Sequence, residues 1–301
     1  MNMRPIPASP ARLALAAALA TISIAIPAVG HAAPPPYGFL AGEGFSFSFS
    51  VGAIQAGRAR ISVGAPGVNK GVNLAAVHGD AQSAPWLSLL AKLEVDYKTL
   101  VDIDALANRS VNAVEKGLRE RKMDLVLEPA GAASNVRFDI VRPKDEHHLT
   151  RTIPGEPVDP IAALFRMRAA PLRDGDKMEF LGFDGPSFYR CQVRVAGHES
   201  IESAGEKTAA IRLELVARRV DDQGRDVGHA PRYATIWLSD DEKRIPYRVA
   251  GDTDFGRCEL ELVGYREGRR LPEAASAAVI RTRPAVILRH GNLGILRAEK
   301  R

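Results

Sequence analysis

The chain has 301 residues, 46% of them hydrophobic and 26% charged, with a formal net charge of +5. That length suits one large β domain or two small ones, with enough apolar residues for a substantial core. The positive charge is concentrated in residues 266–301, which hold nine Lys or Arg and three Asp or Glu. A nucleic-acid-binding protein should instead carry clustered bases and stacking aromatics on its folded part, so we expect no nucleic acid partner.

Residues 1–32 have the pattern of a secretory signal peptide. Arg4 and Arg12 precede an apolar run at 13–29, and no acid occurs in residues 1–32. Small residues at the end of this segment permit cleavage after Ala32. The alternative is an uncleaved membrane anchor, but 17 residues interrupted by a proline are short for a hydrocarbon core about 30 Å thick. We therefore expect a mature chain exported to the periplasm.

Residues 33–265 are predicted to form a single β-rich domain. In GFSFSFSV, residues 44–51, phenylalanine and valine alternate with Gly or Ser, as in a half-buried strand. The same alternation recurs at 59–63 and 211–215, and many short strands of this kind predict a curved antiparallel sheet or open barrel. The other predicted strands are 94–100, 123–127, 136–141, 177–183, 232–238, 245–250 and 257–263.

Two short segments have helical spacing and are predicted to cover an open face or end of the sheet. In the first, 85–92, Trp86 would be either a core residue or part of a groove lining. In the second, 158–167, Asp159 can cap the helix and Pro160 suits its first turn.

The candidate ligand-binding residues are Trp86, Phe165, Arg166 and Arg168. An arginine beside an apolar groove can hold an anionic head group while an aromatic ring contacts the chain. The alternative is that both arginines lie on the solvent side of the second helix.

Cys191 and Cys258 each lie on the apolar face of an alternating segment, CQVRV and CELEL. Export would permit a disulfide between them. A bridge and two separately buried thiols both remain open, because the outcome depends on strand order. The chain has no C-x-x-C pair, so a zinc or redox motif is not indicated.

No set of residues matches a specific active site. The DEHH stretch at 145–148 is dense in ligand types, but neighbours in an extended chain point to opposite faces, which favours a solvated turn over a metal site. Ser187 follows Gly185 and Pro186 but lacks the second glycine of a nucleophile elbow. We expect no catalytic residue, metal or cofactor, and no enzymatic activity.

The acid-rich stretch TIWLSDDEKRIPYRV at 235–249 is predicted to be two strands joined by a bend at 240–243. This register places Trp237 opposite Pro246, with Arg248 diagonally near the indole ring. The acids then need no catalytic role, because turns tolerate short acidic residues.

The segment IWLSDDEKRIPYRV at 236–249 resembles the C-terminal signature of a family of exported bacterial proteins, the DUF3108 domain. AGRARISV at 56–63 and DPIAALFRMR at 159–168 resemble its early strand and central helix, so the resemblance covers roughly 43–263. It implies a curved antiparallel sheet similar to periplasmic lipoprotein carriers and sensors that cradle acyl chains. The family has no settled activity, so the resemblance implies no chemistry, and the tail after Tyr265 departs from its pattern.

These features predict an exported, non-enzymatic envelope protein whose curved sheet binds an apolar or amphipathic ligand, such as a lipid or acyl chain. The alternative is a structural or interaction module of envelope assembly, with a filled core and an envelope protein as partner. The basic tail, 266–301, would be either a frayed end or a contact with an anionic membrane surface.

Overall fold

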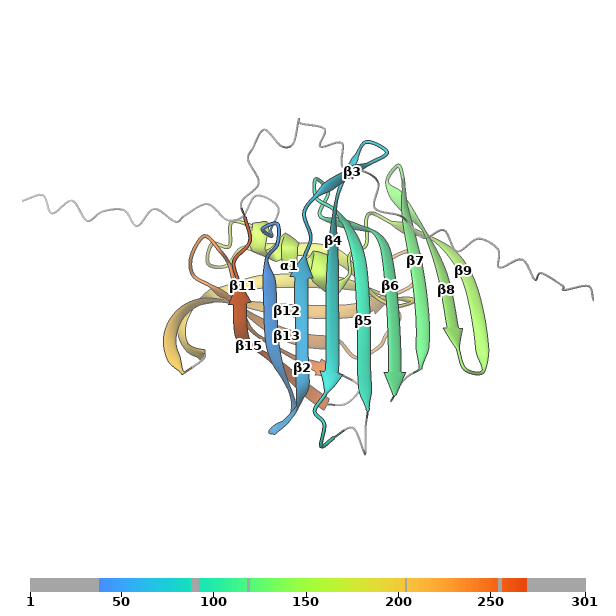
Figure 1. Cartoon of the computed structure of the whole chain (residues 1–301). Helices are drawn as coiled ribbons and strands as arrows, with labels where there is room; N and C mark the ends of the chain where they lie inside the picture. The colour runs from blue at the N-terminus through green and yellow to red at the C-terminus, as the bar shows by residue number, and fades with distance from the viewer. Residues whose placement is uncertain (1–37, 88–91, 118–119, 204, 254–255, 270–301) are drawn as a thin grey trace, which may run out of the picture. The chain divides into compact units, whose positions relative to one another are not determined.

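The computed structural model describes residues 38–269 apart from 88–91, 118–119, 204 and 254–255 (Figure 1). These residues form one antiparallel sheet of 15 strands and one helix, α1 (Pro160–Ala169). The sheet is curved and not closed, which confirms the predicted fold class. The predicted signal peptide, 1–32, and most of the basic tail lie outside the described residues.

The strands fall into two stretches that are each consecutive along the chain. The first contains β1 (Gly44–Val51), β2 (Ile54–Val63), β3 (Gly67–Asn69), β4 (Val72–Ser83), β5 (Leu93–Asp102), β6 (Ala107–Gly117), β7 (Arg121–Ala130), β8 (Ala133–Arg142) and β9 (Asp145–Pro154). The second contains β10 (Lys177–Asp184), β11 (Ser187–Ser203), β12 (Glu206–Val220), β13 (Arg232–Ser239), β14 (Pro246–Thr253) and β15 (Gly256–Arg266). Because β15 pairs with β1, the two stretches form one sheet, with β9 and β10 at its ends; β3 pairs only with β4.

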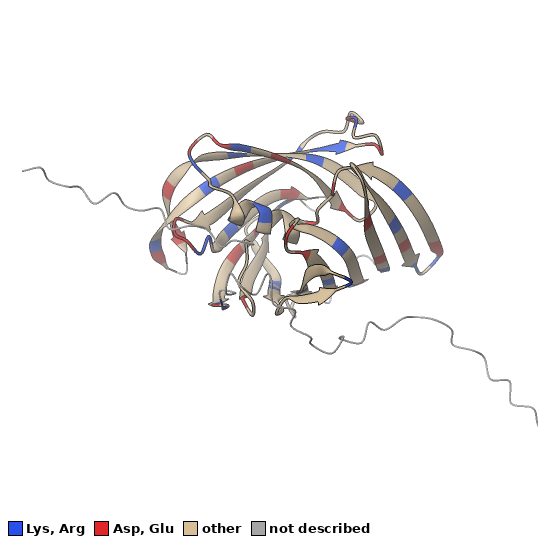
Figure 2. Cartoon of the chain, turned by 90° about the horizontal axis from the view of Figure 1, so that it is seen from above, with Lys and Arg blue, Asp and Glu red and all other residues tan. Residues whose placement is uncertain are grey.

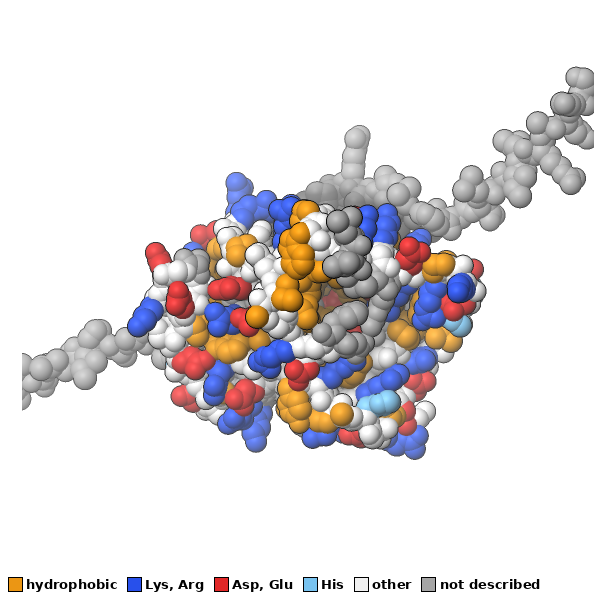
Figure 3. All heavy atoms as spheres, turned by 90° about the horizontal axis from the view of Figure 1, so that it is seen from below, with side chains coloured by type: hydrophobic (Ala, Val, Ile, Leu, Met, Phe, Trp, Pro, Cys, Tyr) orange, Lys and Arg blue, Asp and Glu red, His pale blue; other side chains and the backbone are white. Residues whose placement is uncertain are grey.

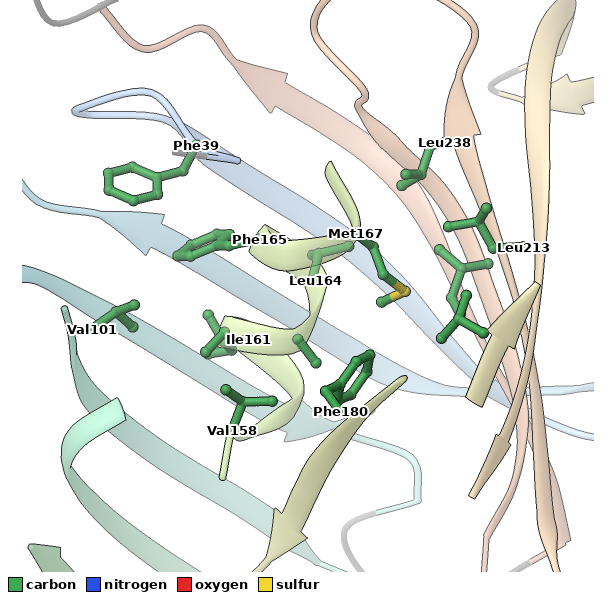
Figure 4. Close-up of a cluster of buried hydrophobic side chains, with 14 of the residues drawn as sticks. Phe39, Val101, Val158, Ile161, Leu164, Phe165, Met167, Phe180, Leu213 and Leu238 are labelled. Atoms are coloured by element: carbon green, nitrogen blue, oxygen red, sulfur yellow. The ribbon is translucent and has the colours of Figure 1, made fainter. Parts of the chain in front are cut away.

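Helix α1 connects the two stretches and lies inside the curve of the sheet (Figure 2). The Asp159 side chain caps it by accepting a hydrogen bond from the Ala162 N–H, and Pro160 occupies its first turn, as predicted. Seven of its ten residues are buried, so α1 fills the interior of the curve instead of presenting a polar face to water (Figure 4). Figure 2 also shows Lys, Arg, Asp and Glu interspersed along the strands, so no side of the sheet carries a single sign of charge.

Side chains, instead of a hydrogen-bond ladder, bring the two ends of the sheet together. The Phe138 ring of β8 meets the Phe188 ring of β11 edge-on at 6.0 Å. Arg151 of β9 donates a hydrogen bond of 2.8 Å to the Pro186 carbonyl, in the turn between β10 and β11. The lead-in to α1 also pairs with β10, through the bridge between Val158 and Gly182. The interior is therefore bounded on this side by packed side chains.

Two predicted local structures differ from the described residues. The helix predicted at 85–92 is replaced by a turn at 85–87, where the Leu87 N–H bonds the Ala84 carbonyl; the rest of that prediction, 88–91, lies outside the described residues and is not tested. The stretch 145–148, predicted to be a solvated turn, instead forms the start of strand β9. It pairs with the end of β8, where Asp145 is opposite Arg142.

The bend at 240–243 joins two strands, as predicted, but the predicted register is wrong. Trp237 pairs with Arg248, and Leu238 pairs with Pro246, because the ladder shifts between these rows. In the turn itself, Asp241 accepts hydrogen bonds from the Ser239 hydroxyl and from the N–H groups of Lys243 and Arg244. The Arg248 guanidinium does lie over the Trp237 ring, 5.8 Å from its centroid.

Candidate ligand-binding cavity

A cavity of about 350 Å³ lies between α1 and the concave face of the sheet. Its size falls within the range of about 300–1,000 Å³ that is usual for small-molecule sites. Its lining is almost wholly apolar and comes from α1, from the residues just before α1, and from strands β1, β2 and β10–β15. The lining residues are Phe47, Ile61, Val158, Asp159, Pro160, Ile161, Ala163, Leu164, Met167, Phe180, Gly182, Phe183, Asp184, Tyr189, Cys191, Leu215, Ala217, Arg232, Ala234, Ile236, Pro246, Val249 and Leu260.

The alternating sequence pattern explains why this space is apolar. Alternate residues of a strand point to opposite faces, so Leu215 and Ala217 of β12 face inward, while Glu214, Val216 and Arg218 face outward. Leu215 is opposite Ala234 in the ladder, and Ala217 is opposite Arg232. Because alanine fills little volume, the side chains of Ala217 and Ala234 leave space beneath α1 at these rows.

A second hollow of about 280 Å³ adjoins the first on the inner side of β2 and β4–β7. The two share Ile61, Ile161 and Phe183 among their lining residues. An ion pair at 2.6 Å between Arg121 and Glu115 lies on the wall of the second hollow. Seen from below, the molecule shows hydrophobic side chains in recesses between charged residues (Figure 3).

A buried polar network anchors the N-terminal end of α1 beside the cavity. The Asp159 carboxylate accepts 2.7 Å hydrogen bonds from the Ala162 N–H and from the Tyr97 hydroxyl. The Asp159 N–H in turn donates to Asn108, whose amide donates to the Thr99 hydroxyl. Burial raises the pKa of Asp159, and burial together with the nearby Asp159 raises the pKa of Tyr97. This network fixes the helix, and its hydrogen bonds occupy both carboxylate oxygens.

Phe165, predicted to contact a ligand, does not line the cavity. It is fully buried, and its ring packs against Phe39 with centroids 4.8 Å apart. The cavity side of α1 is formed instead by Leu164 and Met167. Phe165 is thus a packing residue that holds α1 to the segment preceding β1.

Arg168 is neither a head-group contact nor a solvent-facing residue, which corrects both interpretations of it. Its side chain is fully buried and forms a two-pronged ion pair with Glu43 at 2.7 and 2.9 Å. It also donates to the carbonyls of Lys243 and Arg244, in the turn between β13 and β14. The Tyr265 hydroxyl completes the cluster by donating to Glu43. Arg168 therefore joins α1 to both chain ends of the sheet domain and to the acid-rich turn.

Arg166 and Trp86 also lie outside the cavity lining. The Arg166 guanidinium donates a 2.8 Å hydrogen bond to the Leu106 carbonyl, which ties α1 to the turn between β5 and β6. Trp86 is 55% exposed, so it is neither a core residue nor a wall of the cavity. The predicted ligand-binding set is therefore not brought together.

Cys191 and Cys258 are both free thiols, and the predicted alternative of a disulfide between them is wrong. Cys191 lies in β11 and Cys258 in β15, with three strands between them. At about 4.8 Å per strand this separation far exceeds the Cα distance of about 4.4–6.8 Å that a disulfide requires. Burial raises the pKa of the Cys191 thiol, which lines the cavity, to about 11.

Sequence reasoning missed the residues that do line the cavity at its polar points. Arg232 and Tyr189 come from β13 and β11, and the Arg232 guanidinium lies 5.6 Å from the centroid of the Tyr189 ring. The alternation of RYATIWLS at 232–239 could have placed Arg232 on the same face as Ile236 and Leu238. This alternation is visible in the sequence, but it does not by itself show that Arg232 faces the cavity, because a charged residue at the end of a strand usually faces solvent.

Fold and cavity together define a class: an open, curved antiparallel sheet that encloses one helix and an apolar hollow. The sequence model of the family described as protein of unknown function (DUF3108) matches residues 46–263. The chain therefore belongs to this family, as its resemblance at 236–249 indicated. A comparison with curated proteins found no match.

Two solved structures are similar in outline. One is a β-barrel-like protein of the domain of unknown function DUF1849 from Brucella abortus, with 12% identity and a TM-score of 0.49, covering 75% of this chain and 98% of that chain. The other is a protein with a YmcC-like fold from Bacteroides fragilis NCTC 9343, with 6% identity and a TM-score of 0.34, covering 79% of this chain and 99% of that chain.

Two further searches concern the described residues alone. In that part of the chain, no group of three or more His, Cys, Asp or Glu could hold a metal ion. Among the same residues, no helix has the length and apolar character needed to cross a membrane.

Proposed function

We propose that this chain is an exported, non-enzymatic protein of the periplasm that binds an apolar or amphipathic ligand, such as a lipid or acyl chain. The observation that carries this proposal is the apolar cavity of about 350 Å³ between α1 and the concave face of the sheet. Export is supported by the signal-peptide pattern of residues 1–32.

Removal of water from an apolar chain supplies the affinity in such a site. Each buried methylene contributes about 0.8 kcal/mol, so even a short alkyl chain in the cavity gains several kcal/mol before the cost of association. The walls offer few hydrogen-bonding groups, because Asp159 is already occupied by the Ala162 N–H and the Tyr97 hydroxyl. The cavity therefore favours an alkyl chain over a polar metabolite.

A cavity-filling variant tests the proposal directly. In Ala234→Trp the indole would occupy the space between β13 and α1, so a neutral fluorescent probe such as N-phenyl-1-naphthylamine should lose at least about tenfold in affinity. The matched control is Thr235→Trp, because the neighbouring residue of the same strand points to the opposite face. Ala217→Leu provides a milder second variant if the larger residue prevents folding.

The competing function, an interaction module with a filled core, makes the opposite prediction. It expects no saturable probe binding by the wild-type protein and no difference between the two tryptophan variants. Native mass spectrometry of the purified mature chain adds an independent readout, since a carrier should retain co-purified lipid while a module should show only the mass of the polypeptide.

A further inference from the structure

We infer that the ligand carries two alkyl or acyl chains, and that one chain occupies the cavity while the other occupies the second hollow. This inference rests on the proposed function and adds to it the chemical class of the ligand. Three observations carry it: the two spaces meet at one exposed edge, they extend from that edge beneath different strands, and charged groups of both signs lie at the edge.

The cavity and the second hollow share part of their lining. The shared residues are Ile61, Pro160, Ile161, Phe183 and Asp184. Pro160 and Asp184 are exposed, whereas the other three are buried or partly buried. The two spaces therefore meet along an edge that reaches the surface at the start of α1 and at the end of β10. A ligand can enter both spaces from this side.

From the shared edge the two spaces extend beneath different parts of the sheet. The rest of the cavity lining comes from α1, the residues just before it, and strands β1 and β10–β15, while that of the second hollow comes from β2, β4–β7 and Gly185. Ile161 in the first turn of α1 lies between them. A methyl group added at Gly79 of β4 would be 3.8 Å from Ile161 Cδ1, in ordinary van der Waals contact. Two chains that diverge from one head match this arrangement.

Small inward-facing residues leave space in both halves of the sheet. Ala59 of β2 is opposite Ala81 of β4, and both line the second hollow. Ala217 and Ala234 play the same part in the cavity. Because unfilled volume weakens a protein core, two unfilled spaces that share one edge are best explained by a ligand with a chain for each.

Charged groups at the shared edge suit the polar head of such a ligand. Asp184 is exposed there, and the neighbouring Gly185 approaches Arg121 so closely that a Cβ at this glycine would lie 3.1 Å from Arg121 Nη1. Arg121 in turn forms an ion pair with Glu115 at 2.6 Å. A head placed here stays in contact with water and with charges of both signs, while its chains are removed from water.

One long chain that runs through both spaces is the competing interpretation. Such a chain would have to lay its middle across the exposed edge, where its methylenes stay in contact with water and gain less from burial. Two chains joined at a head leave only the polar part at the edge. The geometry therefore favours the two-chain ligand.

The test compares three ligands that share a phosphocholine head: dioctanoyl-phosphatidylcholine, octanoyl-lysophosphatidylcholine and hexadecanoyl-lysophosphatidylcholine. Calorimetry measures their binding to the mature protein below their critical micelle concentrations. Each methylene moved from water into an apolar site contributes about fourfold in affinity, so the two-chain ligand should bind at least about fiftyfold more tightly than the octanoyl ligand. It should also bind more tightly than the hexadecanoyl ligand, which has the same number of chain carbons.

Filling the second hollow with Ala81→Trp separates the two chains. The two-chain ligand should lose at least about tenfold in affinity, while the octanoyl ligand should change less than about threefold, because its chain can still occupy the cavity. The matched control is Gln82→Trp, because this exposed neighbour points to the outer face of the same strand and should leave all three affinities unchanged. If Ala81→Trp does not fold, Ala81→Leu must still weaken the two-chain ligand more than the octanoyl ligand.

Two results would overturn the inference and leave the proposed function standing. One is binding of the hexadecanoyl ligand as tight as that of the two-chain ligand, with a loss for the hexadecanoyl ligand alone in Ala81→Trp, since one long chain would then run through both spaces. The other is an unchanged affinity for the two-chain ligand in Ala81→Trp, since the second hollow would then be unused. Failure of all three ligands to bind the wild type would instead overturn the proposed function.

Discussion

Arg168 shows how much of the fold depends on one buried charge. Its guanidinium and the Glu43 carboxylate are both fully buried, and each has further hydrogen-bonding partners. Removal of one member of such a pair leaves an uncompensated charge in the interior, which costs about 3–5 kcal/mol. The pair thus couples the start of β1, the end of α1 and the turn before β14.

We predict that Arg168→Met and Glu43→Gln each lower the free energy of unfolding by about 3–5 kcal/mol. The double variant should lose clearly less than the two single losses combined, because neither charge is left alone. Urea unfolding of the four proteins measures this coupling. The control, Arg194→Met, removes an exposed ion pair with Glu214 and should cost about 1 kcal/mol or less. Strict additivity of the two buried substitutions would contradict the account.

The two cysteines should differ in reactivity. Cys191 is buried with a pKa raised to about 11, whereas Cys258 is partly exposed. Because the thiolate is the reactive form, a disulfide reagent should modify Cys258 in the folded protein and Cys191 only upon unfolding. Mass analysis without reductant should show both thiols free. A mass lower by two hydrogens, or equal modification rates in the folded protein, would contradict this assignment.

Among the elements, α1 depends most on the cap at its N-terminus. Asp159→Ala removes the cap and leaves the Tyr97 hydroxyl without its acceptor, so we expect a loss of about 2–4 kcal/mol in the free energy of unfolding. Asp159→Asn keeps an acceptor for the Ala162 N–H and should lose less. Thermal unfolding of both variants at neutral pH checks this order, and equal losses would show that the cap itself contributes little.

The same residue makes a pH prediction. Burial raises the pKa of Asp159 in the folded protein above its usual value of about 3.9. The folded state therefore binds this proton more tightly, and the contribution of Asp159 to stability is largest below about pH 4 and declines as pH rises through the raised pKa. The stability of the wild type relative to Asp159→Asn should fall across that window. A difference that rises with pH would contradict the assignment.

The strands and α1 could be predicted because their signals are local. Alternation in GFSFSFSV and the cap at Asp159 act within a few residues. The register beside Trp237 could not be predicted, since the ladder shifts between Trp237 and Leu238 and the alternation of side chains does not mark such an irregularity.

The candidate site was harder to predict than the fold. Arg168 looked like a head-group contact because its partner, Glu43, lies 125 residues away in the sequence. The cavity lining is likewise assembled from strands β1 and β2 and from β10–β15, whose order in the sheet is not visible in local patterns. Alternation of side chains indicated an apolar face of a curved sheet, but only the placed strands show that Ala217 and Ala234 leave space beneath α1.

At the scale of the whole molecule, the sheet has two interiors that differ in packing. Between its ends, aromatic and aliphatic side chains such as Phe138, Phe188 and Ile153 are tightly packed. Beneath α1, the lining is equally apolar, but the space is not filled. A protein selected only for stability would gain from filling it, since empty volume costs about 24 cal/mol per Å³. This contrast supports the proposal of a ligand in the space beneath α1 and a structural role for the packed region between the sheet ends.

The most direct measurement is methyl NMR of the mature chain with a fatty acid that carries a nitroxide at its chain end. The account predicts selective broadening of the methyl signals of Leu164, Leu215 and Val249, which line the cavity. The signals of Leu125 and Ile153, in the packed region between the sheet ends, should stay sharp. Broadening confined to exposed residues such as Ile54 and Val263, or no saturable broadening at all, would contradict a ligand cavity beneath α1.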